Sequence, residues 1–231
     1  MSRVRKFYEL DFNRLLRNSG CRDPQAETVA HFEHAAQLAR RDGLSATHVL
    51  ARLHAELRWQ SGETRGFPDR FVCDAGLGGL ARWLRATGYE ASWPAEEGDA
   101  ALIREARRVS ATLVTTDTLM MERGVLRDGE IPAVCLPSSL RLGEQLELLF
   151  TALGLRVRAP RCMTCGGELR VVEKQTVADR IPPKTARWLD EYFLCTRCDR
   201  LFWRGTHWQR IAKTLAKVKA QSSKLKGSSK A

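Results

Sequence analysis

Residues 70–93 read RFVCDAGLGGLARWLRATGYEASW, and this stretch decides the fold class of the chain. Its apolar start, Phe71–Cys73, is typical of a buried strand. The periodicity of the next residues predicts a helix over 77–87, which ends at Gly88, and residues 89–93 predict a second strand. A strand, a helix and another strand with short connections indicate a parallel sheet. The first strand runs directly into a charged residue, Asp74, which a buried position alone does not explain.

The same alternation continues along the chain. A helix is expected over 100–109, strands in ATLVTTD (111–117) and IPAVCLP (131–137), and an amphipathic helix in LRLGEQLELLFTALGL (140–155). The continuous apolar runs in both strands are typical of a parallel sheet buried on both faces. We therefore expect residues 68–157 to form one α/β domain with helices on both faces of the sheet.

Residues 1–67 have a helical pattern throughout. Asp23 followed by Pro24 predicts a helix start, Gly43 the end of that helix, and Ser45 the cap of the next one. The segment SGETRGFPDR (61–70) then resembles a linker. Four histidines lie on these helices, and surface or interhelix positions explain them more readily than a metal site: His31, His34, His48 and His54. A protein partner of this helical region is one prediction for its role.

Two CxxC pairs follow the α/β region. Cys162 and Cys165 are separated by 29 residues from Cys195 and Cys198, and each pair can place two thiolates on one ion. Four thiolates complete a tetrahedral Zn²⁺ site with no open position, so the predicted zinc is structural. A redox CxxC is the alternative, and the second copy argues against it. We expect a small zinc ribbon over residues 158–208, with its long spacer accommodating an inserted hairpin.

Aspartates stand at the predicted carboxyl ends of the strands. Asp74 follows the first strand, Asp117 follows the third, and Asp99 opens the helix after the second. Ligands bind at this edge of open α/β sheets. Three close carboxylates repel one another unless a cation lies among them, and oxygen ligands select hard ions such as Mg²⁺ or Mn²⁺. Helix capping is the alternative role for Asp99 and Asp117.

The net charge of +11 is unevenly distributed. It is +3 over residues 1–70, −1 over 71–161 and zero over 162–199, while residues 200–231 carry nine basic and no acidic side chains. Such a segment attracts polyanions, of which nucleic acid is the commonest in a cell, although it can also serve only solubility. We expect residues 209–231 to form a basic tail that lacks order without a partner.

Composition argues against membrane and secreted classes. No apolar run approaches the roughly 18–20 residues that cross a bilayer, and the basic start MSRVRKFYEL lacks the apolar core of a secretory signal. Seven cysteines without an export signal favour metal binding over a disulfide framework. The cytoplasm is the expected location.

Five segments together resemble one family. They are FVCDAGLGGLARWLRATGYE (71–90), DAALIREA (99–106), TLVTTDTLMMERG (112–124) and the cysteine segments RCMTCGGEL (161–169) and FLCTRCDRLFWRGTHW (193–208). They resemble the PIN-like RNase domain with a fused zinc ribbon, the family named for the C-terminal part of the Mut-seven exonuclease. The resemblance spans about residues 70–208 and implies a Rossmann-like PIN-type fold, an acidic metal site and RNA hydrolysis.

The resemblance also implies roles for particular residues. The acidic positions of the family fall on Asp74, Asp99 and Asp117, and its zinc ligands fall on four cysteines: Cys162, Cys165, Cys195 and Cys198. Thr116 stands where the family commonly has arginine. A fourth acid has no clear counterpart, with three candidates: Glu96, Glu97 and Glu144. The family says nothing about residues 1–67.

Side chains near these motifs have two possible roles each. Arg82 and Arg85 lie off the apolar face of the helix after Asp74 and could meet substrate phosphates, although solvent-facing arginines are as common. Trp203 and Trp208 could stack on bases, but a small zinc module also needs aromatic residues for its core. For His207 we favour a hydrogen bond within the ribbon over a contact with RNA.

The sequence therefore predicts a metal-dependent ribonuclease with Asp74, Asp99 and Asp117 as catalytic metal ligands. One alternative is a non-catalytic RNA-binding adaptor with a vestigial acidic site. Another is a phosphohydrolase acting on small phosphate esters, although Ala75-Gly76 lacks the second aspartate usual in such enzymes. The RNA target, the endo- or exonucleolytic mode and the oligomeric state are not encoded in any motif that we recognise.

Overall fold

The computed structural model describes residues 3–94, 98–205, 209, 211–213 and 216. These residues group into two compact units. The first unit comprises the described residues of Met1–Leu80 and Trp93–Leu155, and the second comprises those of Ala81–Ser92 and Arg156–Ala231. The domain boundary predicted near residue 67 does not separate these units, because the N-terminal helices group with the parallel sheet.

Three helices open the first unit: α1 (Arg3–Asn18), α2 (Pro24–Asp42) and α3 (Ala46–Gln60). Their ends confirm the predicted start and stop signals. The Asp23 carboxylate accepts the backbone N–H of Ala26 at 3.0 Å, and the Ser45 hydroxyl accepts that of His48 at 3.1 Å. Gly43 ends α2 at φ +65°, a left-handed conformation that glycine adopts without a steric cost.

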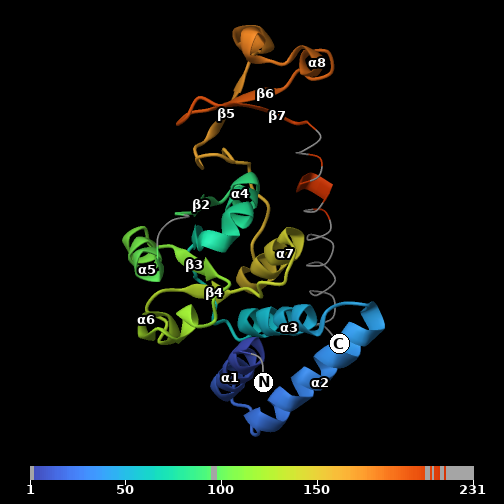
Figure 1. Ribbon diagram of the computed structural model, residues 1–231, viewed down its shortest axis with the longest axis vertical. Helices are drawn as coiled ribbons and strands as arrows, with labels where there is room; N and C mark the ends of the chain where they lie inside the picture. Colours follow the sequence, from blue (N-terminus) through green and yellow to red (C-terminus); the bar gives the residue numbers. More distant parts are fainter. Residues whose placement is uncertain (1–2, 95–97, 206–208, 210, 214–215, 217–231) are drawn as a thin grey trace. The chain divides into compact units, whose positions relative to one another are not determined.

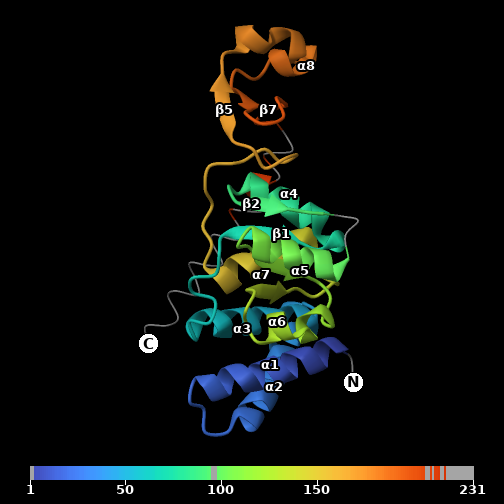
Figure 2. The same ribbon diagram turned by 90° about the vertical axis from the view of Figure 1, so that its left-hand side faces the viewer.

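The three helices are packed on the rest of the first unit through α3. Helix α3 contacts α7 (Leu142–Leu153), and α1 and α2 lie on the side of α3 that faces away from α7 (Figure 2). Four apolar side chains of α1 are fully or almost fully buried: Tyr8, Phe12, Leu15 and Leu16. The hydroxyl of Thr64, which follows α3, donates to the backbone oxygen of Ala152 in α7.

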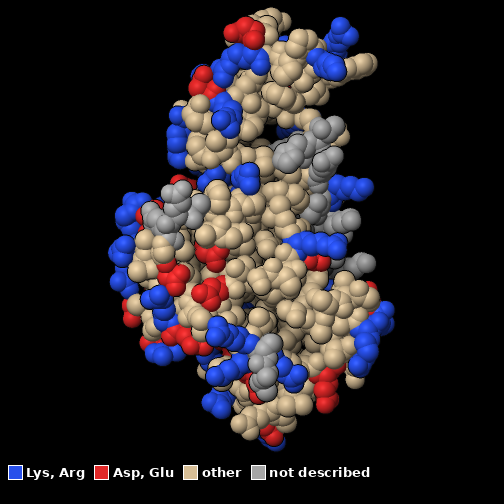
Figure 3. Space-filling model, in the orientation of Figure 1, with Lys and Arg blue, Asp and Glu red and all other residues tan. Residues whose placement is uncertain are grey.

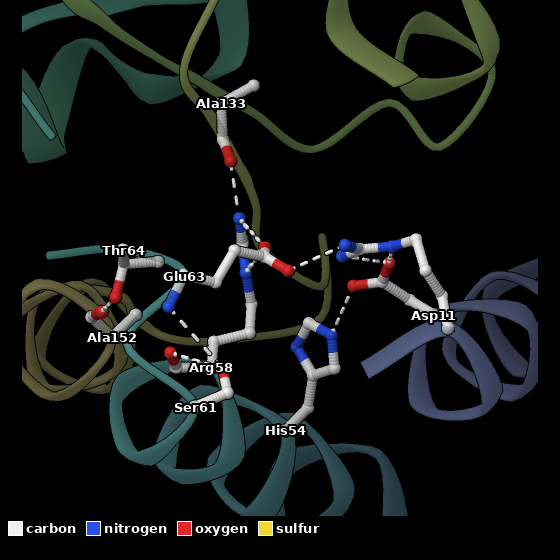
Figure 4. Close-up of polar contacts among 9 residues, drawn as sticks. Asp11, His54, Arg58, Ser61, Glu63, Thr64, Ala133 and Ala152 are labelled. Carbon is white, nitrogen blue, oxygen red and sulfur yellow. Dashed lines mark hydrogen bonds and ion pairs between the residues drawn. The ribbon is translucent and has the colours of Figure 1, made fainter. Parts of the chain in front are cut away.

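A buried polar network also ties these helices to the sheet (Figure 4). Asp11 and His54 form a hydrogen bond of 2.7 Å between α1 and α3. Arg58 donates to Glu63 at 2.8 Å and to the backbone oxygen of Ala133 at 3.3 Å. Burial alone would raise the pKa of Asp11, but the hydrogen bond to His54 and nearby positive charges outweigh it and hold that pKa well below its usual range.

The first unit contains a parallel sheet (Figure 1). Its strands are β1 (Arg70–Cys73), β3 (Thr112–Thr115) and β4 (Ala133–Cys135), in the order β1-β3-β4. Val72 pairs with Leu113, and Leu113 pairs with Ala133, in parallel register. All of β3 and the last three residues of β1 are buried, as their continuous apolar runs predicted.

Helices cover the sheet, which confirms the predicted α/β class. Figures 1 and 2 show α5 (Asp99–Arg108) and α6 (Gly124–Arg127) on one side of β3 and β4, with α7 on the other. Leu102 and Ala106 of α5 pack with Val72 and Leu113 of the sheet in one apolar cluster. Shorter helical turns follow the strand ends and complete this unit: η1 (Ala75–Leu77) after β1 and η2 (Met120–Glu122) after β3.

The second unit holds residues 81–86 of α4, strand β2 (Glu90–Ser92) and a small antiparallel sheet. Helix α4 spans Gly78–Ala86. The antiparallel strands are β5 (Leu169–Val172), β6 (Tyr192–Cys195) and β7 (Leu201–Trp203), in the order β5-β6-β7. We call residues 161–205, which contain this sheet and all four CxxC cysteines, the ribbon.

The 29-residue spacer between the cysteine pairs contains strand β5 and two helical turns. These turns, η3 (Lys174–Arg180) and α8 (Pro183–Ala186), connect β5 to β6. Because β5 and β6 pair antiparallel, the spacer contains the hairpin that we expected, with helical turns in its long connection. Val177 and Ile181 from the insertion form a buried cluster with Tyr192 and Leu194 of β6. In the described part of the chain, no helix is long and apolar enough to span a membrane.

Candidate active site and metal centre

Asp74 lies at the carboxyl end of β1, as the sequence predicted, and is held there by hydrogen bonds. The hydroxyl of Thr115 donates to Oδ2 at 2.5 Å, and the backbone N–H of Thr116 donates to the same oxygen at 2.9 Å. The backbone N–H of Gly76 donates to Oδ1 at 3.1 Å. With only 9% of its surface exposed, the carboxylate is stabilised by neutral donors at the end of β3 and in the turn after β1.

Asp117 lies beside the same threonine. Its backbone N–H donates to the hydroxyl oxygen of Thr115 at 2.9 Å, and its Oδ1 accepts the N–H of Leu119 at 2.8 Å. The Thr115 hydroxyl therefore connects the two aspartate positions, donating to one residue and accepting from the other. Asp117 is exposed, unlike Asp74. Its hydrogen bond to Leu119 also fits the capping role that the sequence left open.

Asp99 has a different environment. Gly98 is the N-cap of α5 and Asp99 is the first residue of the helix, so the predicted capping position is shifted by one residue. A carboxylate in the first helical turn is still favourable to the helix dipole. The guanidinium of Arg123 donates to its Oδ2 at 3.0 Å, with both side chains about half exposed. Such an exposed pair contributes little to stability.

The three aspartates do not converge into one compact ligand set. Among the described residues, the group of acidic, histidine or cysteine ligands whose atoms all lie within 4.8 Å of one another is the set of four cysteines. Asp74 and Asp117 nevertheless share an electrostatic environment. Burial, followed by the negative charges of Asp117 and Asp74, raises the pKa of the Cys135 thiol at the end of β4 to about 12. Figure 3 shows acidic side chains over β3, β4 and α5.

The two arginines predicted to contact substrate differ in their surroundings. Arg82 is exposed on α4. Arg85 is partly buried, and its guanidinium donates to the backbone oxygens of Ala91 at 2.7 Å, Met163 at 3.1 Å and Thr164 at 2.8 Å. These contacts join α4, β2 and the first cysteine knuckle. They account for Arg85 as a structural residue and argue against the substrate-binding role that we predicted for it.

The four cysteines of the ribbon converge as predicted. The sulfur atoms of Cys162 and Cys198 are 3.7 Å apart and those of Cys165 and Cys195 are 3.4 Å apart. Metal–sulfur bonds of about 2.3 Å in a tetrahedron place sulfurs about 3.8 Å apart, so the spacing fits a metal such as Zn²⁺. Burial raises the pKa of Cys195, but the backbone N–H groups of Cys198 and Arg197 outweigh it and lower that pKa to about 6.

Two glycines allow the first cysteine knuckle to close. Gly166 has φ +76°, and its backbone N–H donates to the oxygen of Cys162 at 2.8 Å. A Cβ atom on Gly167 would lie only 2.8 Å from the sulfur of Cys195. The Gly166-Gly167 pair therefore both forms the tight turn and leaves space for the second cysteine pair.

A comparison with protein families matches this arrangement. A family model described as the Mut7-C RNAse domain matches residues 69–215, which is more than half of the 231 residues. The chain belongs to the Mut7-C RNAse domain family. No curated protein and no solved structure matches the chain. The match confirms the resemblance inferred from the motifs and supports a nuclease-type activity at the level of the family.

The Mut7-C region begins just before β1 and includes both cysteine pairs. Helices α1, α2 and α3 lie outside it, although they belong to the same compact unit as β1, β3 and β4. The family match therefore leaves the role of the N-terminal helices open.

The remaining candidates in the Mut7-C region have mixed outcomes. Glu144 caps α7, because its Oε2 accepts the backbone N–H of Arg141 at 2.7 Å. Trp203 packs against the ribbon core, as we favoured. Four other candidates lie outside the described residues: Glu96, Glu97, His207 and Trp208.

Thr115 is the main residue of this site that sequence reasoning missed. The only available signal was the TTD pattern at the end of the third strand.

Proposed function

We propose that this Mut7-C protein is a metal-dependent ribonuclease that hydrolyses RNA phosphodiester bonds at the strand edge formed by β1 and β3. The family match supports a ribonuclease. The placement of Asp74 and Asp117 around the Thr115 hydroxyl is the observation that carries the assignment of the site. RNA is then the substrate, and the basic C-terminal segment provides a sequence-independent attraction for it.

The donor chemistry of this edge fits Mg²⁺ or Mn²⁺, because carboxylate and hydroxyl oxygens are hard ligands. Asp74 and Asp117 would hold the ion, and Asp99 would join them after leaving Arg123. A cation bound there would lower the pKa of a coordinated water and neutralise charge on the scissile phosphate.

The residues of the chain prepare the site by fixing Asp74. Thr115 and Thr116 both donate to Oδ2 of Asp74, and Gly76 donates to Oδ1, so the carboxylate has one orientation. Asp117 is held through its backbone by Thr115 and keeps an exposed side chain at the surface of the edge. Both carboxylates are then oriented before substrate binds.

The test is RNA cleavage by the purified chain and by Asp74→Asn, using labelled single-stranded and structured RNA with Mn²⁺ or Mg²⁺. Asp74→Asn keeps the shape of the side chain but removes its charge, and we expect at least a 100-fold loss of cleavage rate. Asp190→Asn is the matched control, because Asp190 is 89% exposed in the ribbon and pairs only with Lys174 among the interactions described here. Equal cleavage by the Asp74 variant and the parent would contradict the proposal.

A non-catalytic RNA-binding adaptor is the second candidate, favoured by the Arg123–Asp99 pair and by Thr116 in place of the arginine common in the family. If the protein is an adaptor, both the parent and Asp74→Asn should bind RNA, and neither should cleave it with Mn²⁺ or Mg²⁺. Hydrolysis of small phosphate esters without RNA cleavage would instead indicate the phosphohydrolase.

The ribbon has a supporting role in this proposal. Cys162, Cys165, Cys195 and Cys198 would hold a structural Zn²⁺, and the ribbon would assist RNA binding. Arg82 stays a proposed phosphate contact, whereas Arg85 does not. A cytoplasmic location and a protein partner for the N-terminal helices also remain predictions.

A further inference from the structure

The two faces of the ribbon sheet have different surroundings. Successive residues of a strand point to opposite faces, and the register therefore assigns each side chain to one of them. Tyr192 pairs with Trp203, and Leu194 pairs with Leu201, on the face that packs against the helical insertion. This face supplies the core of the ribbon.

The opposite face carries a row of apolar side chains across all three strands. Val171 of β5 pairs with Phe193 of β6, which pairs with Phe202 of β7. Val171 is 70% exposed, and both phenylalanines are only half-buried. We call these three residues the aromatic face. An aromatic pair in direct cross-strand register on the solvent side of so small a sheet is not needed for its core.

A hollow of about 380 Å³ adjoins this face. Its lining includes Phe193, Phe202, Leu169 and Met163, with two arginines among them, Arg161 and Arg204. The guanidinium of Arg204 lies over the ring of Phe193, 5.7 Å from its centre. Arg204 also pairs with Glu191 at 3.2 Å, where both side chains are about half exposed. The hollow is therefore lined mainly by apolar side chains, with two arginines among them.

The chemistry of the hollow favours a nucleobase over an apolar protein anchor. Bases stack on aromatic rings and on arginine planes, and the phosphates beside them need positive charge. Positive charge is available, because Arg161 and Arg204 both line the hollow. A partner protein binding here would need an acidic surface around an apolar anchor, whereas single-stranded RNA presents both chemistries in every nucleotide.

We infer that the aromatic face is a stacking platform for unpaired bases of single-stranded RNA, with Phe193 and Phe202 as the stacking rings and Arg161 and Arg204 facing the adjoining phosphates. The choice of RNA as the polymer rests on the proposed function. Trp203 is not part of this platform, because it packs against the ribbon core, the role that we favoured over stacking.

The test measures binding separately from cleavage. Full-length protein carrying Asp74→Asn is titrated into fluorescein-labelled dodecauridylate, and into an abasic dodecamer with the same phosphates, and the dissociation constants are read by anisotropy over a range of salt. The Asp74→Asn protein is the parent, and the double variant carries Phe193→Ala and Phe202→Ala in addition. The matched control is Trp188→Ala, because Trp188 is an aromatic residue of the same ribbon that is 84% exposed and lies outside the strands.

The platform predicts at least a tenfold loss of uridylate affinity in the double variant and no loss for the abasic strand. The salt dependence should keep its slope, because the phosphate contacts are unchanged. Trp188→Ala should bind both strands as the parent does, and changing both phenylalanines to tyrosine should preserve uridylate binding. Unchanged uridylate binding in the double alanine variant, an equal loss for the abasic strand, or an equal loss in Trp188→Ala would overturn the inference.

A second measurement does not depend on the folding of any platform variant. Dodecauridylate containing 5-iodouridine is photocrosslinked to the Asp74→Asn protein, and the modified residues are identified by mass spectrometry. Crosslinks at Phe193 or Phe202 support the platform, and crosslinks confined to other residues overturn it. Because the cleavage site is already disabled, a wild-type protein that fails to cut RNA would defeat the proposed nuclease without affecting either result.

Discussion

At the scale of single residues, the candidate active site depends on one hydroxyl. Thr115 is buried at the last position of β3, donates to Asp74 at 2.5 Å and accepts from the backbone of Asp117 at 2.9 Å. The hydroxyl thereby connects the ends of two neighbouring strands. A carboxylate with so little exposure needs such donors, because a buried charge without them is costly.

Thr115→Val tests this connection, since valine has the shape of threonine without its hydroxyl. The change leaves the Asp117 N–H without this acceptor and removes one donor from Asp74, so we expect a loss of about 1–3 kcal/mol in the free energy of unfolding. Urea denaturation followed by circular dichroism measures it. Thr115→Ser keeps the hydroxyl and should lose clearly less. A loss in Thr115→Val no larger than that in Thr115→Ser would show that the hydroxyl does not stabilise this connection.

The positions of Asp74 and Asp117 could be predicted from the sequence. An aspartate directly after a buried apolar strand lies at the carboxyl edge of the sheet, regardless of how the rest of the chain packs. This reasoning was not sufficient for Asp99, whose partner Arg123 is 24 residues away on another element. Arg85 is a similar case, since its acceptors Met163 and Thr164 are separated from it by almost 80 residues. The local sequence pattern predicts which helix or strand carries a side chain, but it does not predict a hydrogen-bond partner that is distant in the sequence.

At the scale of elements, the packing of α3 on α7 depends on a glycine. Gly154 ends α7 at φ +59°, and a Cβ atom there would lie 2.3 Å from the ring of Trp59 in α3. Two separate features therefore favour glycine at this position. They are the left-handed backbone conformation and the close approach of the Trp59 ring. Gly129 has a similar φ of +76°, but nothing lies within 4 Å of its Cβ position.

Comparing Gly154→Ala with Gly129→Ala separates these two requirements. Gly129→Ala should cost about 1 kcal/mol, the strain of a left-handed alanine. Gly154→Ala should cost about 1–3 kcal/mol more, because Trp59 must move. Adding Trp59→Ala to both backgrounds should bring the two glycine effects to the same size. If the two glycine variants lose equal free energy of unfolding while Trp59 is present, the Trp59 ring moves aside without a cost. The ring then does not restrict the contact between α3 and α7.

Most elements were predictable, because apolar periodicity, caps and glycine stops are local signals. The starts of α2 and α3 lie where Asp23 and Ser45 indicated. The docking of α3 on α7 was not predictable, since neither apolar face specifies its partner. For the same reason, the segment at residues 61–70 resembled a linker, whereas Glu63 and Thr64 in fact make contacts that hold the helices in place.

At the scale of the whole molecule, the two units differ in how they obtain stability. The first has a sheet with helices on both sides and many fully buried apolar residues. The ribbon has a cluster of only four buried residues, Val177, Ile181, Tyr192 and Leu194. A core of this size rarely suffices alone, and metal binding then supplies folding free energy directly.

Metal removal should therefore affect one unit and spare the other. We expect about one Zn²⁺ per chain, and its removal by a chelator should abolish the hydrogen-exchange protection of β5, β6 and β7 while β1, β3 and β4 keep theirs. Exchange of individual peptides read by mass spectrometry resolves the two sheets, and Cys162→Ser with Cys198→Ser should reproduce the effect without chelator. Persistent protection in β5–β7 would mean that the cysteine cluster is not what folds the ribbon. Loss of protection in β1, β3 and β4 as well would mean that the two units do not fold independently.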